Sequence, residues 1–326
     1  MPGKDRSTIY AVADRAGVSI ATVSRVLRGT AAVAPRTRDR VLSAATELRY
    51  VPSGAASQLA SSRQATLGLV LPHIDGAYYS ELIVGFEQEA GEHDHSVSLL
   101  LANPRHDATR AVRDLAERVS GLGFLARSSA GDDLITDLTG PRRVVTVARG
   151  PLPQVPSLRV ENLASARALA DHLVATGRRR LCYLGTPEPG SDVEERVAGF
   201  AQALEGHGLQ PVGVHHCALD EESGTAAVRE VLDRWPDVDA LVCGNDLVAL
   251  SVLRELRERR RRVPEDCAVV GWDDILAARH VTPGLTTVRQ PVQQVGRLAA
   301  RMLITGNTDE VPPRLPSSVV HRNSCC

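Results

Sequence analysis

Side chains that bind phosphate are concentrated at the start of this 326-residue chain. The first sixty positions hold nine basic and four acidic residues, a net charge of +5, whereas the whole chain carries −1 and the remainder therefore −6. Guanidinium groups form charge-assisted hydrogen bonds with phosphates and with guanine edges. This distribution indicates a polyanionic partner at one end of the molecule. A solvated basic surface explains the same charge, so the charge alone leaves both interpretations open.

Other residue groups suggest metal or catalytic chemistry but lack the required spacing. "HDH" at 93–95 and "HHC" at 215–217 hold potential ligands, yet neighbouring residues on a strand point to opposite faces. Neither group has a partner pair at zinc-site spacing, and the six cysteines contain no CxxC motif. No P-loop, GxSxG, HExxH or glycine-rich dinucleotide motif occurs. We therefore expect no enzyme activity, no cofactor and no metal.

Two further clusters have structural interpretations. "RERRRR" at 257–262 ends a predicted helix, where cations complement the helix dipole; this explanation is favoured over a second nucleic-acid patch. The adjacent Cys325 and Cys326 either form a disulfide between molecules or belong to a frayed, reduced tail. We favour the frayed tail, because no export signal precedes the chain and a reducing compartment is expected.

The elements that would position the basic residues are short helices. Thr8 is a predicted N-cap, Gly17 is suited to the left-handed conformation that ends a helix, and Ser19 is a predicted N-cap for the next helix. Apolar residues repeat at helical spacing: Ile9, Val12, Ala13 and Ala16, then Val23, Val26 and Leu27. Two short helices joined by a tight turn with glycine are typical of a helix-turn-helix.

A third helix is predicted after Pro35. Its inward residues would be Val41, Leu42, Ala45 and Leu48, with Arg36, Arg38 and Arg40 facing outward. The second helix would then enter the major groove, with Ile20 and Ala21 making apolar contacts and Arg25 reaching a guanine edge or a phosphate. A three-helix bundle with no DNA role remains the alternative. The candidate DNA contacts in this part are Thr8, Ser19, Ile20, Ala21, Thr22, Ser24, Arg25, Arg28 and Arg36.

The rest of the chain alternates short aliphatic runs with amphipathic stretches. This alternation predicts parallel sheets with helices on both faces, and its restart after residue 160 suggests two similar lobes. Ligands of such folds bind beyond the carboxyl ends of the strands, here in a cleft between the lobes. Predicted strands lie in "LGLVLP", "VSLLLA", "RVVTVA", "RLCYLG", "GVHHCAL", "ALVCGN" and "CAVVGWD", and predicted helices span 79–93, 109–119, 163–176, 194–207, 222–234 and 246–260.

The sequence resembles the lactose/galactose repressor family of bacterial transcription regulators. At the N-terminus the resemblance rests on "TIYAVADRAGVSIATVSRVLRG" and "TRDRVLSAATELRYVPS". In the body it rests on "GAYYSELIVGFEQEA", "EERVAGF", "NDLVALSVL", "VPEDCAVVGWDD" and "LTTVRQPVQQVGRLAA". It implies a small all-α helix-turn-helix head on an α/β body of two doubly wound parallel-sheet lobes, similar to periplasmic binding proteins.

The resemblance also implies domain boundaries. The helix-turn-helix domain would span 1–51 and a hinge or linker 52–64, where Leu59, with Ala56 on the same face, would wedge into the minor groove. Without that resemblance the segment is a plain Ser/Ala/Gly linker. The effector-binding and dimerisation domain would span 65–326. Its first lobe would hold about 65–160 and 290–318, and its second about 161–289 and 319–326, with chain crossings near 160, 290 and 318.

Six cleft residues are expected to contact a small-molecule effector. Arg196, Asn245, Asp273 and Gln290 match family positions that contact ligand, and Tyr78 and Tyr79 begin the helix after the first strand. The alternative for each is a polar or packing contact between the lobes. Leu219 replaces a stacking aromatic of several relatives, and Ala148 replaces an aspartate. The missing ring argues against a planar purine and favours a sugar or sugar derivative.

These features together predict a cytoplasmic, nucleoid-associated transcription repressor whose operator binding is modulated by an effector. We expect a homodimer on a near-palindromic double-stranded operator, since two-fold protein symmetry requires matching half-sites. The sequence ends in "VVHRNSCC" and shows no amphipathic extension of the kind that a tetramerising tail needs, so we expect a dimer. A small-molecule (solute) binding protein without a DNA role is the alternative, and an enzyme is a remote third.

Overall fold

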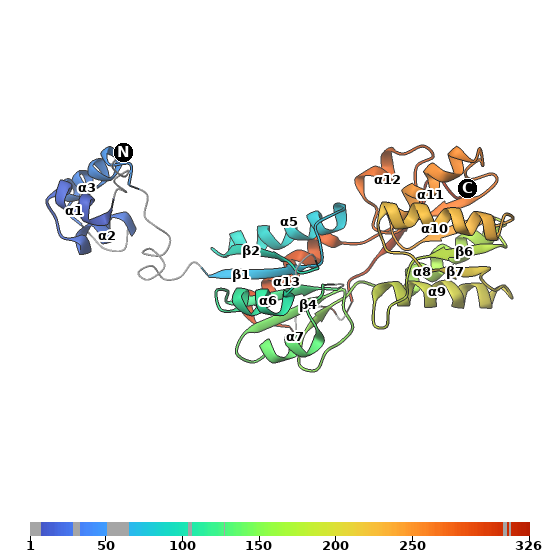
Figure 1. Ribbon diagram of the computed structural model, residues 1–326, viewed down its shortest axis with the longest axis horizontal. Coiled ribbons are helices and arrows are strands. Elements are labelled where there is room, and N and C mark those ends of the chain that lie inside the picture. Colours follow the sequence, from blue (N-terminus) through green and yellow to red (C-terminus); the bar gives the residue numbers. More distant parts are fainter. Residues whose placement is uncertain are drawn as a thin grey trace. The chain divides into compact units, whose positions relative to one another are not determined.

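The computed structural model describes residues 8–28, 33–50, 65–103, 106–126, 128–308, 312 and 314–326. The chain divides into two compact units, Met1–Gln64 and Ala65–Cys326, here called the head and the body (Figure 1). No helix among the described residues is long and apolar enough to cross a membrane.

The head contains three helices, α1 (Ile9–Ala16), α2 (Ile20–Arg28) and α3 (Pro35–Glu47). The Thr8 hydroxyl accepts a hydrogen bond from the amide of Ala11, and Gly17 ends α1 with φ +62°, as predicted. Ser19 Oγ accepts from the amide of Thr22 at the start of α2. The core is formed by small apolar side chains of all three helices, with Val12, Val23 and Val41 fully buried among them.

One expectation for α3 needs correction. Leu42 does not face inward: it is 41% exposed, and Ala44 is buried instead, because Val41, Ala44, Ala45 and Leu48 are spaced for one helical face. Arg40 is exposed, as predicted, and part of its guanidinium also makes contacts within the head. Its guanidinium donates to the carbonyl oxygens of Ala16 (2.7 Å) and Gly17 (3.3 Å), so it satisfies the open C-terminal end of α1.

The first lobe of the body is a five-stranded parallel sheet in the order β2-β1-β3-β4-β5 (Figure 1). One face packs against α5 and α13, and the other against α6 and α7. The strands are β1 (Thr66–Leu71), β2 (Ser96–Leu101), β3 (Gly121–Leu125), β4 (Arg143–Val147) and β5 (Ser157–Leu158), and the helices are α5 (Ala77–Glu92), α6 (Ala108–Ala116), α7 (Asp132–Leu138) and α13 (Val292–Thr305).

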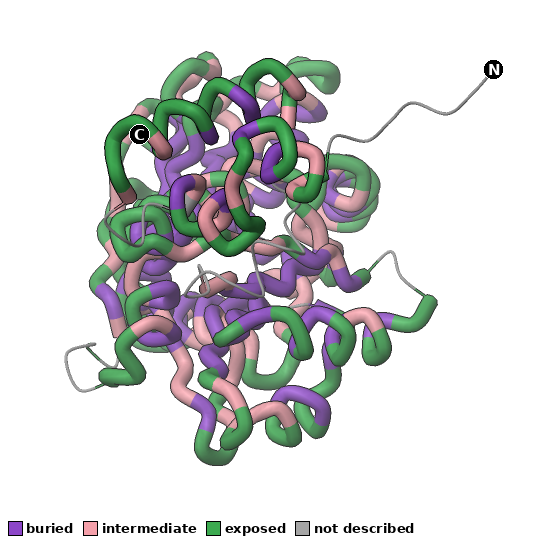
Figure 2. Tube along the Cα trace, turned by 90° about the vertical axis from the view of Figure 1, so that its left-hand side faces the viewer, coloured by how far each residue is buried: buried purple, intermediate pink, exposed green. Residues whose placement is uncertain are grey.

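The second lobe is a four-stranded parallel sheet in the order β7-β6-β8-β9. Helices α8 and α9 cover one face, and α10, α11 and α12 cover the other. Figure 2 shows the buried residues inside the lobes and the exposed ones on outer helix faces and loops. The strands are β6 (Leu181–Leu184), β7 (Gly213–His215), β8 (Ala240–Cys243) and β9 (Ala268–Val270), and the helices are α8 (Leu163–Ala175), α9 (Asp192–Gly206), α10 (Glu221–Arg234), α11 (Asp246–Glu258) and α12 (Leu276–His280).

The chain passes between the two lobes at three places. Val160 forms a bridge with Leu315 beside the first lobe, while β10 (Thr287–Arg289) and β11 (Ser318–Val320) pair antiparallel beside the second. The side chains of Leu158, Val292 and Leu315 belong to the core of the first lobe, whereas Val288 and Val319 pack into that of the second. Short extended segments therefore connect two separately packed cores.

Two parts of the body differ from expectation. Strand β3 and helix α7 were not predicted, although β3 is the middle strand of its sheet and pairs with both β1 and β4. The C-terminal tail is not frayed: Ser324 and Cys325 are fully buried, and the amide of Val269 donates to the carbonyl oxygen of Ser324 (2.8 Å). The tail is thus held against β9 at the edge of the second sheet.

Candidate functional site

A cavity of the body lies where the carboxyl ends of both sheets meet. The segments after β1, β3 and β4 line it from the first lobe, and those after β6, β7, β8 and β9 line it from the second. Loops at these ends carry the ligand-binding groups of open parallel sheets. The lining side chains are His73, Asp75, Tyr78, Tyr79, Leu125, Ala126, Ala148, Ser191, Asp192, Val193, Arg196, Leu219, Asp220, Asn245, Leu247, Asp273 and Ile275, with Gly76 and Ala77.

Arg196 is the buried cation of this cavity. Its Nε donates to Oδ1 of Asn162 (2.9 Å) and its Nη1 to the carbonyl oxygen of Gly244 (2.7 Å). The guanidinium carbon lies 4.4 Å from the centroid of the Trp272 ring, a cation–π contact. These three partners hold the guanidinium in one orientation at the cavity wall.

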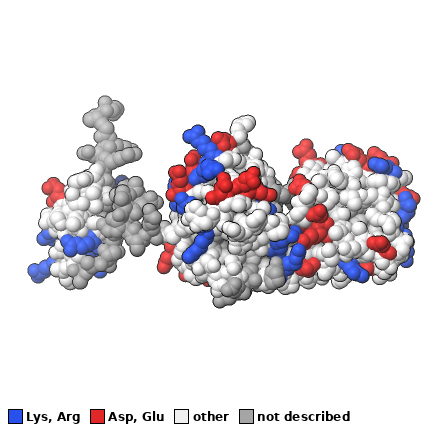
Figure 3. Space-filling model, turned by 90° about the horizontal axis from the view of Figure 1, so that it is seen from below, with Lys and Arg blue, Asp and Glu red and all other residues white. Residues whose placement is uncertain are grey.

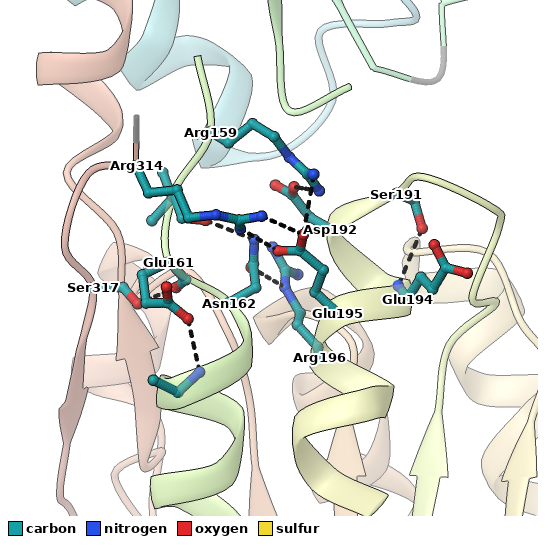
Figure 4. A network of polar contacts seen from close by, with 12 residues as sticks. Arg159, Glu161, Asn162, Ser191, Asp192, Glu194, Glu195, Arg196, Arg314 and Ser317 are labelled. Atoms are coloured by element: carbon teal, nitrogen blue, oxygen red, sulfur yellow. Dashed lines mark hydrogen bonds and ion pairs between the residues drawn. The ribbon is translucent and has the colours of Figure 1, made fainter. Parts of the chain in front are cut away.

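Acidic and basic residues around the first turn of α9 fix that helix to the connecting segments (Figure 4). Arg159 is paired with Asp192 (3.2 Å) and with Glu195 (3.0 Å), and Arg314 makes a bidentate pair with Glu195. Arg159 and Arg314 belong to two segments that connect the lobes, whereas Arg196 follows Glu195 directly. Since α9 also receives the Ser191 cap, its N-terminal turn is held from several sides.

Asp273 is a half-buried carboxylate on the same wall. Its backbone has φ +115°, a conformation that L-residues rarely adopt and that is often retained at functional sites. Nε2 of Gln290 donates to its Oδ1 (2.6 Å). Burial raises the pKa of Asp273 to about 7, while the positive charge of Arg196 opposes that rise. The side chain therefore changes its protonation near neutral pH.

Asn245 combines a structural role with its place in the cavity. Its Oδ1 accepts from the amide of Val248 and so caps α11, while its Nδ2 donates to the carbonyl oxygen of Leu219 (3.0 Å). The second hydrogen of the amide group remains for a further acceptor. The side chain thus ties β8 to the loop after β7 at the cavity wall.

Tyr78 and Tyr79 form the aromatic part of the cavity. Their rings meet edge-to-face with centroids 5.4 Å apart, and Tyr79 also contacts the ring of His73 at 4.7 Å. Burial raises the pKa of Tyr78 far above its ordinary value, and the nearby carboxylates Asp192 and Asp273 raise it further. Its hydroxyl therefore stays protonated and can donate a hydrogen bond.

The head has its own exposed surface at the start of α2. Ile20 (40% exposed), Ala21 and Arg25 face solvent, and Nε of Arg25 donates to the carbonyl oxygen of Ala21 (3.3 Å). Arg36 is exposed on α3. Figure 3 shows several basic side chains on the visible face of the head. In helix-turn-helix proteins this end of the second helix is the part that enters the major groove.

Comparison with known proteins identifies the family. Residues 8–53 match the family described as "Bacterial regulatory proteins, lacI family", and residues 170–325 match "Periplasmic binding protein-like domain". The HTH-type transcriptional regulator CelR of Thermobifida fusca is 36% identical over 97% of this chain and 96% of its own. The chain belongs to the LacI family.

Other LacI-family proteins match over nearly the same length. Catabolite control protein A of Priestia megaterium is 31% identical over 91% of this chain and 91% of its own. The lac repressor dimer bound to operator and the anti-inducer ONPF has a TM-score of 0.85 at 26% identity, covering 98% of this chain and 99% of that one. The CelR–cellobiose complex has a TM-score of 0.72 at 32% identity, covering 98% and 100%.

These LacI-family relatives confirm the predicted fold class and the function as a DNA-binding transcriptional regulator. The solute-binding alternative is not favoured, because the family match includes the helix-turn-helix region. The LacI family consists of transcription regulators.

Five of the six effector candidates of this LacI-family chain line the cavity. Gln290 does not: it stands behind Asp273 and orients that carboxylate. Leu219 and Ala148 both line the cavity. The prediction overlooked Asp192 and Asp220. Asp192 is the first residue of α9, after β6, and Asp220 is the N-cap of α10, after β7. Ligands of parallel sheets bind at such strand ends, so this rule, applied to every strand, would have identified both residues.

The DNA candidates are spread over the start of the head. Thr8 and Ser19 act as helix caps, and the hydroxyl groups of Ser19 and Thr22 are within hydrogen-bonding distance at 2.9 Å. Ser24 is half-buried. The side chain of Arg28, and Ala56 and Leu59 in the predicted hinge, lie outside the described residues.

Proposed function

We propose that this regulator is a homodimeric repressor whose operator binding is controlled by a sugar or sugar derivative bound in the body cavity. The observation that carries the proposal is the convergence of Arg196, Asn245 and Asp273 on one cavity between the two lobes. A guanidinium, an amide and a carboxylate supply donors and acceptors in fixed directions, as a polyhydroxylated ligand requires.

The remaining cavity wall supports a sugar over a flat heterocycle. Asp192 and Asp220 add carboxylates that accept hydrogen bonds from hydroxyl groups, while Leu219 offers no stacking ring. Tyr78 and Tyr79 form one short aromatic wall, against which the apolar face of a pyranose can pack. The solved structure of CelR, which is 32% identical in sequence, is a complex with cellobiose. We therefore expect a mono- or disaccharide as the effector.

The head supports sequence-specific binding of double-stranded DNA. Ile20 and Ala21 would read apolar groups such as the thymine methyl, and Arg25 would contact a guanine or a phosphate. The lac repressor, a relative of the same fold, is described as a dimer bound to operator. Two copies of this chain would read two half-sites of a near-palindromic operator, with Leu59 as the minor-groove wedge. Such a protein acts in the cytoplasm, where the chromosome lies.

The connecting segments offer a route from the cavity to DNA affinity. Arg159 and Arg314 bind the first turn of α9, which carries Arg196, so a ligand that moves this turn also pulls on two segments between the lobes. An effector changes operator affinity only if it binds the two lobe arrangements with different affinity. We propose that the sugar favours the arrangement with weak operator binding.

A binding screen tests the effector part. Cellobiose and a panel of other sugars and nucleosides are added to the purified full chain, and thermal unfolding is followed. A ligand at about 100 times its Kd stabilises the protein by about 2.7 kcal/mol. Arg196→Ala should lose this stabilisation, whereas the exposed Arg167→Ala on α8 should retain it. Stabilisation by nucleosides and not by sugars would overturn the sugar class.

A DNA-binding measurement tests the head. Operator affinity should fall steeply with salt, because neutralised phosphates release counterions. Leu59→Ala should abolish specific binding and leave non-specific binding in place. A salt-independent affinity would contradict DNA binding by the head, and unchanged specificity in Leu59→Ala would contradict the wedge.

A further inference from the structure

Three metal-binding side chains meet on the second lobe, away from the residues that line the cavity. They are His172 in the last turn of α8, and Cys325 and Cys326 in the C-terminal tail. One ligand atom from each residue lies within 4.8 Å of the other two. Spacing along the chain does not reveal this cluster, because 153 residues separate the histidine from the nearer cysteine.

The cluster is held in place by contacts that do not depend on an ion. Ser324 is held through both its backbone and its side chain. Its carbonyl oxygen accepts a hydrogen bond from the amide of Val269. Its hydroxyl accepts from the amide of Thr286 and donates to the carbonyl oxygen of Val269. Cys325 follows directly and is fully buried. Helix α8 is packed into the core of the lobe on either side of His172, and the ring of His321 lies against that of His172 with centroids 4.3 Å apart.

The distances fit a tetrahedral metal ion. A zinc ion with Zn–S of about 2.3 Å and Zn–N of about 2.0–2.1 Å separates two sulfurs by about 3.8 Å, and a sulfur from a nitrogen by about 3.5 Å. The two Sγ atoms of Cys325 and Cys326 are 3.7 Å apart, and Cys325 Sγ is 3.3 Å from His172 Nε2. Two of the three edges between the ligand atoms are therefore already near the lengths that coordination requires, and the third, from Cys326 to His172, lies within 4.8 Å.

We propose that His172, Cys325 and Cys326 form a binding site for a thiophilic metal ion of the zinc class. Thiolate and imidazole ligands select such ions over magnesium or calcium. Cys326 is exposed, so the ion enters from solvent and water completes the fourth position. Binding replaces two thiol protons with one divalent ion and releases both protons to solvent. The bound ion fastens the tail, just after β11, to helix α8.

The spectrum of cobalt substitution tests the site directly. Full-length protein is purified in a phosphine reductant, stripped with a chelator and titrated with Co²⁺, then with Zn²⁺ in competition. We expect one ion per chain, a sulfur-to-cobalt charge-transfer band and the intense visible bands of tetrahedral cobalt. Loss of a residue that only orients a ligand weakens metal binding by about 10–100-fold. Cys326→Ser and His172→Ala remove ligands and should weaken zinc binding by more than about a hundredfold.

Matched variants separate coordination from folding. Cys326 is exposed, so Cys326→Ser should keep the melting temperature of the wild type in chelator. His207 is a surface histidine of the same lobe that hydrogen-bonds to Asp171, and His207→Ala should bind cobalt as the wild type does. Cobalt binding without the charge-transfer band, or equal affinity in Cys326→Ser, would overturn the proposal. So would a disulfide between Cys325 and Cys326 that survives the reductant.

Discussion

Asp273, a half-buried residue of the cavity, has both a strained backbone and a raised pKa. A φ of +115° in a non-glycine residue costs of the order of 1–3 kcal/mol and persists only when the surroundings enforce it. Here the amide of Asp273 donates to the carbonyl oxygen of Val288, and Gln290 holds the carboxyl group. The connecting strand β10 therefore presents this acid to the cavity.

Effector affinity should depend on pH through Asp273. Burial raises its pKa to about 7, whereas the same group ionises near pH 4 in the unfolded chain. The unfolded chain therefore gives up this proton first, so the free energy of unfolding falls as pH rises from about 4 to about 7 and then levels off. Hydroxyl groups of a sugar donate to the ionised form. Binding should therefore strengthen between pH 6 and pH 8, by at most about tenfold per pH unit. Isothermal titration calorimetry at several pH values measures this change.

Asp273→Asn provides the control for that measurement. The amide keeps an acceptor oxygen for Gln290 but cannot ionise, so the pH dependence between 6 and 8 should vanish. Asp133→Asn changes an exposed carboxylate on α7 and should leave the dependence intact. A steep dependence that survives in Asp273→Asn would assign the titration to another group.

Two glycines set the packing of the helices that cover one face of the first lobe. A Cβ on Gly296 of α13 would lie 2.2 Å from the carbonyl oxygen of Leu82, and one on Gly85 of α5 would lie 2.0 Å from that of Gln293. These contacts are with backbone atoms, which cannot turn aside as a side chain can. The two helices therefore touch backbone to backbone and depend on the missing side chains.

Gly296→Ala should destabilise the body. Forcing a methyl group into a filled contact costs about 1–3 kcal/mol through displaced backbone. Gly206→Ala is the matched control: Gly206 ends α9, its Cβ would meet nothing within 4 Å, and alanine is the better helix former by about 0.5–1 kcal/mol. Urea unfolding of the two variants should shift in opposite directions. A neutral Gly296→Ala would show that α5 and α13 can separate without cost.

Helices and strands were predicted well where their signals lie in neighbouring residues, and poorly where they depend on contacts with distant segments. The Thr8 cap, the left-handed Gly17 and the β–α alternation depend on neighbours in sequence, and the structure confirms them. Strand β3 reads "GLGFL", and its two glycines lower its apparent strand preference. At Gly121 a Cβ would lie 3.2 Å from the side chain of Leu303, a tight contact, so the glycine favours close packing of α13 against β3. Such packing is set by a helix 180 residues away.

The sequence predicts the cavity residues that follow strand ends or match a family motif. It does not predict which distant side chains hydrogen-bond to one another. Arg196 and Asp273 follow strand ends, so their place in the cavity could be foreseen. That Gln290 stands behind Asp273, and that Asn162 orients Arg196, depends on contacts between distant segments. The same holds for Arg40, whose guanidinium binds the end of α1.

At the scale of the whole molecule, the proposed regulation requires that effector and operator affect each other equally. If the sugar weakens operator binding by some factor, operator DNA must weaken sugar binding by the same factor, because both equilibria share one cycle. Couplings of this kind are typically 1–3 kcal/mol, or about 5–150-fold. We expect the two measured factors to agree within error for the full-length dimer.

The test compares the effector Kd of the full chain alone and with saturating operator DNA, and the operator Kd with and without effector. Operator should raise the effector Kd by the factor by which effector raises the operator Kd, whereas a scrambled duplex of equal length should change it less.

The Arg159–Glu195 pair offers a structural check, since it ties α9 to a segment between the lobes. Glu195→Gln removes the charge that both Arg159 and Arg314 bind, so the coupling factor should shrink while operator affinity without effector stays within a few-fold. An undiminished factor in Glu195→Gln would show that the coupling runs through other contacts.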